Sequence, residues 1–131
     1  DTIGITLYAP AWRRVPFPEH PERLMSSASM SRTGHEFVVS DGGGVTVYER
    51  RSDAWTGTSL ESSDRAVVAI SSDGRVVVAG GARDGVDGRG RALVYERSDA
   101  GWSPGFALMR PSGAQRFGRS VAISGDGNTI A

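Results

Sequence analysis

Few residues in this chain have side chains that could carry out chemistry, and most of them recur at one kind of position. The two histidines, His20 and His35, have no carboxylate or thiol at the spacing that metal ligands or an acid–base pair require. Ser31, Ser71 and Ser124 each end an apolar run, which is typical of turn capping rather than of a catalytic triad. We therefore expect the two histidines to lie at the surface and the three serines to cap turns.

The carboxylates and glycines fit the same description. Asp73 and Asp126 are each followed by glycine. An Asp-Gly pair favours a turn over a role in acid–base catalysis. The glycines from Gly85 to Gly90 resemble a phosphate-binding loop only weakly, because no Gly-Lys-Ser or Gly-Lys-Thr follows. With no paired carboxylates and no histidine set, we predict that the chain is not an enzyme.

The elements that position these residues are hairpins. The stretch DRAVVAISSDGRVVVAGG, residues 64–81, has a β-branched run on each side of an Asp-Gly turn, and a second copy begins at Arg119 as RSVAISGDGNTIA. This pattern is the signature of a tight hairpin between two strands. Because the apolar residues run nearly unbroken, we expect these strands to be covered on both faces.

Aromatic residues repeat along with the hairpins. Tyr8, Tyr48 and Tyr95 are separated by 40 and 47 residues, and the tryptophans that follow them by 43 and 47. Repeats of this length that are built from strands indicate propeller blades. The regular recurrence of Trp12, Trp55 and Trp102 favours packing between blades over an aromatic platform for sugars.

The predicted fold is all-β, with about three four-stranded antiparallel blades in one partial β-propeller domain spanning residues 1–131. Residues 25–60 and 66–109 are each expected to form a blade. Residues 1–17 would supply the outer strands, and residues 117–131 the inner strands, of a third blade split between the termini. Because closed propellers typically have 4–8 blades, either a second copy completes the ring or the chain is part of a larger assembly.

Composition excludes some partners. The formal net charge is 0, so no basic field predicts binding to nucleic acid or to an anionic membrane. The chain has no cysteine and no apolar run long enough to cross a membrane, and its N-terminus lacks the pattern of a signal peptide. These features leave the cellular compartment undecided.

Residues 116–131, RFGRSVAISGDGNTIA, carry a family resemblance. With Phe117-Gly118 as the FG element and Gly80-Gly81-Ala82 at the position of the GAP element, the chain resembles the FG-GAP repeats of integrin-α-like β-propellers. The resemblance covers nearly the whole chain. It departs from the family pattern at the FG pair, which is replaced by Asp64-Arg65 and by Leu24-Met25 in the other copies.

The resemblance implies a calcium site in the glycine loop after the second strand. The best candidates are Asp84 and Asp87, flanked by Arg83 and Arg89. Calcium prefers 6–8 oxygen ligands. Two carboxylates supply too few of them, and the two neighbouring arginines would repel the cation. The loop at residues 40–44 is too short to surround an ion. We therefore favour a plain glycine-rich turn and no cofactor, with calcium at Asp84 and Asp87 as the alternative.

The function predicted from these observations is that of a non-enzymatic scaffold that binds other proteins through surface complementarity. The expected contact residues lie in the loops without a counterpart in the repeat: Arg83, Arg89, Arg91, His20 and Arg23. The alternative implied by the resemblance is a calcium- or carbohydrate-dependent adhesion domain at the cell surface. An enzyme that uses the central channel of a propeller is a third hypothesis. An extracellular or lumenal location is implied by the resemblance alone.

Overall fold

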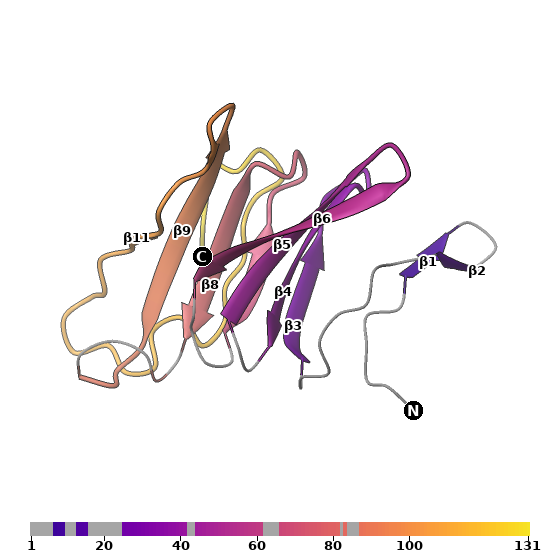
Figure 1. The fold of residues 1–131 in the computed structure, drawn as a ribbon. Helices are drawn as coiled ribbons and strands as arrows, with labels where there is room; N and C mark the ends of the chain where they lie inside the picture. Colours follow the sequence, from indigo (N-terminus) through magenta and orange to yellow (C-terminus); the bar gives the residue numbers. More distant parts are fainter. Residues whose placement is uncertain are drawn as a thin grey trace.

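The computed structural model describes residues 7–9, 13–15, 25–41, 44–61, 66–81, 83 and 87–131, and all regular elements in them are β-strands (Figure 1). The strands form two antiparallel sheets and a separate hairpin of β1 (Leu7–Ala9) and β2 (Arg13–Val15). The prediction of an all-β fold is confirmed. Within these residues, no helix is long and apolar enough to cross a membrane.

The first sheet is a meander in which each strand pairs with the next one along the chain. Its strands are β3 (Met25–Met30), β4 (Glu36–Asp41), β5 (Gly44–Arg51) and β6 (Ala54–Glu61). Only two residues join β5 to β6, and the first of them, Ser52, has a φ of 55°. Positive φ in such a short loop matches the right-handed twist of the strands, so the hairpin closes tightly.

The second sheet repeats this order, but its fourth strand is broken. After β7 (Val67–Ile70), β8 (Val76–Gly81) and β9 (Arg91–Ser98), two short strands pair with β9: β10 (Gly101–Trp102) and β11 (Phe106–Ala107). The sequence predicted one strand beginning near Trp102. Pro104 explains the difference, because it lies between the two short strands and has no N–H to donate to the ladder.

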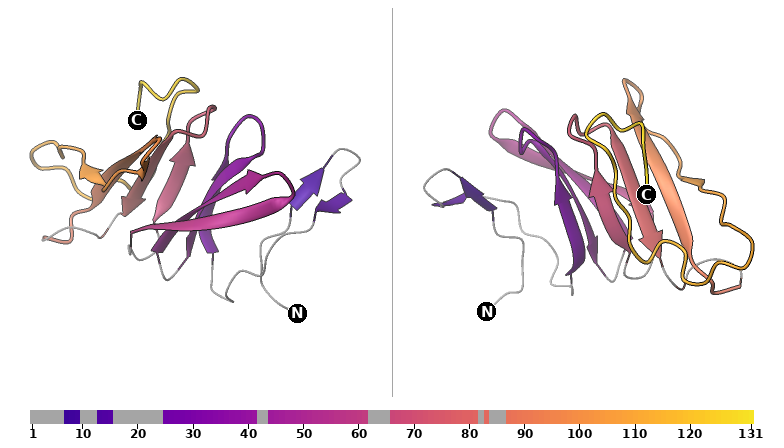
Figure 2. Two further views of the ribbon diagram at one scale, coloured as in Figure 1. Left: turned by 45° about the horizontal axis from the view of Figure 1, so that its top comes forward. Right: turned by 180° about the vertical axis from the view of Figure 1, so that it is seen from behind.

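The hydrophobic core fills the space between the two sheets. It is made of buried side chains from facing strands: Val38, Val45, Val47, Ala66, Val68, Ile70, Val77, Ala79, Leu93 and Tyr95. The strand β7 lies beside β3 and β4 (Figure 2). Such burial removes apolar surface from water and is the main force that holds the sheets together.

Serine hydroxyls also join the two sheets. The backbone N–H of Val68 donates to Ser27 Oγ at 3.1 Å, and that of Ile70 donates to Ser29 Oγ at 3.2 Å. Because β7 is at the edge of its sheet, these N–H groups have no strand partner, and the two serines of β3 satisfy them.

Tyr48 and Tyr95 occupy the same place in the two sheets, each against a glycine. A Cβ atom at Gly57 would lie 2.9 Å from Tyr48 Cε1, and one at Gly105 would lie 2.7 Å from Tyr95 Cε1. The glycines therefore let the rings lie flat across the neighbouring backbone. The two rings differ in burial, because Tyr95 is 1% exposed whereas Tyr48 is only half-buried.

The turn at 71–76 shows what the serine and aspartate of the repeat do. Gly74 has a φ of 72°, and its N–H donates to the Ser71 carbonyl at 3.0 Å. Ser71 Oγ donates to Asp73 Oδ1 at 2.6 Å and accepts from the N–H of Val76 at 3.0 Å. The hydroxyl is thus a bridge inside the turn, as expected for a capping serine.

The other two turns repeat these contacts. At 124–129, Ser124 Oγ donates to Asp126 Oδ1 at 2.6 Å and accepts from the Thr129 N–H at 3.0 Å. At 31–36, a threonine replaces the aspartate, and Ser31 Oγ donates instead to Glu36 Oε2 at 2.6 Å. The same backbone hydrogen bonds close all three turns.

The segment 117–131 lies against the face of the second sheet that points away from the first (Figure 2). A Cβ atom at Gly80 in β8 would fall 2.1 Å from the Gly118 carbonyl oxygen, so only glycine allows this approach. The segment folds back on itself through two hydrogen bonds between Ala122 and Ala131, of 2.8 and 3.0 Å. Three layers therefore follow one another: the first sheet, the second sheet and this hairpin.

Candidate functional site

Among the candidate metal ligands, Asp87 is held by arginines. Its Oδ1 accepts from Arg110 Nη1 at 2.9 Å, and its Oδ2 accepts from Arg110 Nη2 at 2.6 Å. The backbone N–H of Arg89 adds a third bond, at 3.1 Å. The bidentate bond to Arg110, followed by that of Arg89, holds the pKa of Asp87 well below its ordinary range. Asp87 therefore fastens the glycine loop to the segment after β11.

These contacts define what a cation would need at this loop. Calcium would have to replace the guanidinium of Arg110 at both oxygens of Asp87, since both are already paired. Asp84, the second predicted ligand, lies outside the described residues. Within the described part of the chain, no group of three or more His, Cys, Asp or Glu residues could hold a metal ion. The calcium site stays a prediction.

The predicted protein contacts divide between the surface and the interior. Arg83 and Arg89 are exposed, whereas Arg91 is half-buried at the start of β9. The Arg91 carbonyl lies only 2.3 Å from where a Cβ atom of Gly118 would be, so this part of the loop faces the segment 117–131. His20 and Arg23 lie outside the described residues.

A groove of about 620 Å³ opens between the outer strands of the two sheets. The ends of β5 and β6 form one wall, and the ends of β9 and β10 form the other. Charged groups and one indole line most of it: Glu49, Arg51, Arg75, Arg97, Asp99 and Trp102. Sequence reasoning missed this groove, because its residues come from strands and turns of two different sheets and share no motif.

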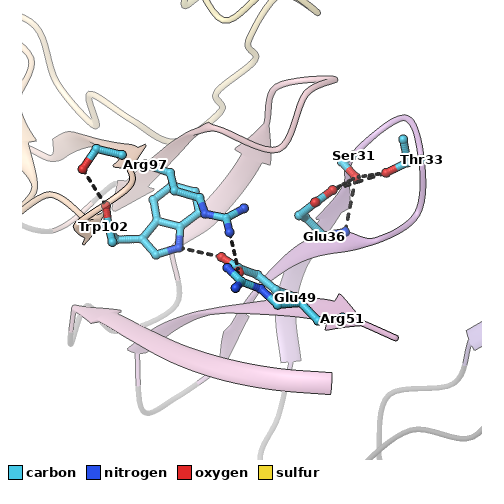
Figure 3. A network of polar contacts seen from close by, with 9 residues as sticks. Ser31, Thr33, Glu36, Glu49, Arg51, Arg97 and Trp102 are labelled. Atoms are coloured by element: carbon cyan, nitrogen blue, oxygen red, sulfur yellow. Dashed lines mark hydrogen bonds and ion pairs between the residues drawn. The ribbon is translucent and has the colours of Figure 1, made fainter. Parts of the chain in front are cut away.

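Glu49 is the centre of the polar network in the groove (Figure 3). Its Oε1 accepts from Trp102 Nε1 at 3.2 Å, and its Oε2 lies 3.0 Å from Arg97 Nη2 and 3.5 Å from Arg51 Nη2. Its side chain is only 13% exposed, so the two arginines balance a charge that would otherwise be costly to bury. Arg75, from the turn at 71–76, also lines the groove, and its positive charge contributes to lowering the pKa of Asp73.

The tryptophans of the repeat contact different partners. Trp102 packs on the core between the sheets and bonds to Glu49 in the first sheet. Trp55 makes an edge contact with the ring of Phe37, with centroids 5.1 Å apart. Trp102 thus has the position between neighbouring units that the repeat predicted, while Trp12 lies outside the described residues.

The turns at 31–36, 71–76 and 124–129 are joined to one another as well. The N–H of Arg32 donates to the Ser72 carbonyl at 3.0 Å, and the N–H of Ser72 donates to the Gly125 carbonyl at 3.0 Å. Each of these is the second residue of its turn. The three layers are therefore linked by one repeated hydrogen bond that always runs in the same direction.

No protein-family model matches the chain, and no curated protein matches its sequence. The resemblance to FG-GAP repeats stays a prediction based on residues such as Phe117 and Gly118, and the function has to be argued from geometry.

Proposed function

We propose that this chain is a non-enzymatic scaffold of β-propeller type, whose layers are blades and whose partners are other protein chains. The observation that carries the proposal is the one-way stacking of three layers through equivalent contacts. Units that stack in one direction leave a donor face at one end and an acceptor face at the other, so they close into a ring or continue as an array.

The two end segments support a shared blade. Residues 117–131 form one hairpin without two further strands beside it in the described part of the chain, while β1 and β2 form a separate hairpin. In this proposal, each hairpin lies beside strands of a second chain or of a larger complex. Ring closure by strands from two segments also protects sheet edges, which would otherwise promote aggregation.

Binding rather than catalysis is the proposed activity, because the polar groups that catalysis would use are engaged in structure. Ser71 and Ser124 bridge their own turns, and Asp87 is held by Arg110. Arg83 and Arg89 are exposed and could take part in a protein contact, although Arg89 Nε also lies 3.8 Å from Asp87 Oδ2, and arginine is enriched where interfaces are strongest.

The mass of the particle in solution tests the proposal. Light scattering coupled to gel filtration, over a range of concentrations, is expected to show two copies of the chain, or the chain together with another protein in material isolated from its source. A single copy at all concentrations, alone in both kinds of material, would contradict the scaffold proposal.

A second candidate function, carbohydrate-dependent adhesion, is favoured by the groove. An indole beside guanidinium and hydroxyl groups suits a sugar that carries a carboxylate, since its ring has apolar faces and its charge pairs with arginine. Titration calorimetry with a uronic acid oligosaccharide is expected to show saturable heat that Arg75→Gln abolishes. The neutral oligosaccharide of the same length is the control, and equal heat from both would contradict this function.

The calcium-dependent form of adhesion has its own test. Titration of calcium into the metal-free chain is expected to give a saturable heat if the loop binds the ion, and Asp87→Asn would remove it. Arg110→Gln is the informative partner variant, because it frees the Asp87 carboxylate from its guanidinium. Absence of heat in both the natural chain and this variant would exclude the loop as a calcium site.

A further inference from the structure

The hydrogen bonds between turns have two open ends. Arg32 uses its N–H and Gly125 uses its carbonyl in the chain of bonds that passes through Ser72. The Arg32 carbonyl and the Gly125 N–H make no hydrogen bond with the described residues. These two groups are an acceptor and a donor of the kind that join the turns elsewhere in the molecule.

Equivalent residues in β3 and β7 show which face lacks a neighbour. The turns align Met30 with Ile70 and Ala28 with Val68. Ile70 and Val68 are each 6% exposed because the first sheet covers them, whereas Met30 is 48% exposed and Ala28 is also exposed. The first sheet therefore presents an uncovered surface at the place where the second sheet is buried.

The opposite end of the stack carries a matching group. Ser27 accepts the N–H of Val68 across the interface between the sheets. Counted back from the turn serine, the equivalent of Ser27 in the last hairpin is Ser120, which is exposed and makes no hydrogen bond with the described residues. Ala28 is the residue of β3 that aligns with Val68. In a contact of the same kind, Ser120 Oγ would therefore accept a hydrogen bond from the backbone N–H of Ala28 in a neighbouring copy.

We propose that a second copy of this chain docks its β3 face on the 117–131 hairpin, with the Gly125 N–H donating to the second copy's Arg32 carbonyl. Ser120 Oγ accepts the N–H of Ala28 in the same contact, and Met30 becomes buried. This inference rests on the proposed function, since it names the partner and the atoms that join it. The contact continues the interface already present between the layers, so no new geometry is needed.

Proline at position 125 tests the contact with little change to the fold. The Gly127 N–H bonds to the Ser124 carbonyl at 2.9 Å, and Asp126 has no positive φ, so Gly125 is the second residue of a type I turn. Proline is favoured there; it removes the N–H and adds ring atoms, of which the Cβ would lie 2.9 Å from Ser72 Oγ. Gly125→Pro is expected to raise the dissociation constant of the two-copy particle about tenfold, as measured by analytical ultracentrifugation.

Two variants serve as controls. Gly125→Ala adds the same Cβ atom near Ser72 Oγ but keeps the N–H, so its dissociation constant should stay within about twofold of the natural chain. Arg32→Pro removes the N–H that bonds to Ser72 within one chain but keeps the Arg32 carbonyl. It should lower the unfolding temperature and leave association unchanged.

Amide hydrogen exchange gives a second measurement. The Ser72 amide is expected to be protected in the single chain and in the particle, whereas the Gly125 amide should gain protection only in the particle. If the two-copy particle forms but Gly125→Pro associates like Gly125→Ala, the proposed contact is wrong and the scaffold function stands. If the natural chain remains a single copy at all concentrations, the second copy is excluded as the partner.

Discussion

Each sheet consists of an inner hairpin, β3–β4 or β7–β8, and an outer hairpin, β5–β6 or β9–β10. The inner hairpins of the two sheets resemble each other more closely than the outer hairpins do. The inner strands β4 and β8 have the same succession of buried positions, and the turns before them have the same backbone hydrogen bonds. The outer strands do not match. Strand β6 is continuous over eight residues, whereas its counterpart is divided into β10 and β11 around Pro104.

The difference follows from what each hairpin contacts. The inner hairpin of the second sheet touches a neighbouring layer on each side, and its turn bonds to the turns of both layers, so a change in its shape would be transmitted to both neighbours. An outer hairpin ends in solvent, where the layers separate and leave room for the groove. Stacking therefore restrains the inner half of each unit, while the outer half is free to diverge.

The largest effect is expected where an inner strand allows no side chain. In Gly80→Ala, the new Cβ atom would collide with the backbone oxygen of Gly118 and with Val121. Because backbone cannot rotate away, we expect the variant to lose about 3 kcal/mol of unfolding free energy, measured by urea denaturation. Loss of protection from amide exchange in residues 117–131 should accompany it.

Ser40 provides the control, since it holds the position of Gly80 in the first sheet and already has a Cβ atom. Its hydroxyl is buried without a hydrogen-bond partner among the described residues. Ser40→Ala should therefore change stability by no more than about 1 kcal/mol, in the stabilising direction. Equal losses at the two positions would contradict the view that layer contact fixes the inner strands.

A smaller effect is expected in the outer hairpins, where two glycines lie against tyrosine rings. Gly105→Ala should cost about 2 kcal/mol, because Tyr95 is 1% exposed and has no room to move away from the new methyl group. Gly57→Ala should cost less than about 1 kcal/mol, since Tyr48 is half-buried and its ring can shift toward solvent. Thermal unfolding of both variants measures the difference. A larger loss of stability in Gly57→Ala than in Gly105→Ala would contradict the argument from the burial of the two tyrosine rings.

The sequence was sufficient for the features that depend on local patterns. Nearly unbroken apolar runs on both sides of Asp73-Gly74 predicted β7, β8 and the turn between them, and the recurrence of Tyr48 and Tyr95 predicted that two sheets share one plan. Both follow from backbone preferences that act over a few residues. The identification of the sheets as propeller blades stays a prediction, because it depends on an arrangement larger than the two sheets.

The features that the sequence did not predict depend on residues far apart in the chain. The partner of Asp87 is Arg110, 23 residues away, and no spacing rule connects a glycine loop to a segment after a broken strand. The groove likewise brings Glu49 to Trp102, 53 residues apart. Periodicity places strands, but only the packing of one sheet on the other decides which charged side chains meet.

The smallest expected effect is a difference in acid sensitivity between the two turns that contain an aspartate, 71–76 and 124–129, and the turn at 31–36, which contains a threonine instead. Hydrogen bonds from Ser71 and from the Arg75 N–H lower the pKa of Asp73, and those from Ser124 and the Asn128 N–H lower the pKa of Asp126. A carboxyl group whose pKa is lower in the folded state stabilises the fold above its unfolded pKa of about 4. That contribution is lost as the pH falls through the lowered folded pKa.

Conversion of both turns to the threonine type should therefore make stability less sensitive to acid. We expect the Asp73→Thr and Asp126→Thr double variant to lose less unfolding free energy than the natural chain between about pH 5 and pH 2. Asp99→Asn is the control, because its carboxylate accepts no hydrogen bond from the described residues. If the double variant and the natural chain lose stability in parallel, the aspartates act only through backbone shape. The threonine turn at 31–36 would then be equivalent to the other two, and the inner hairpins would share the pH dependence of their stability as well as their geometry.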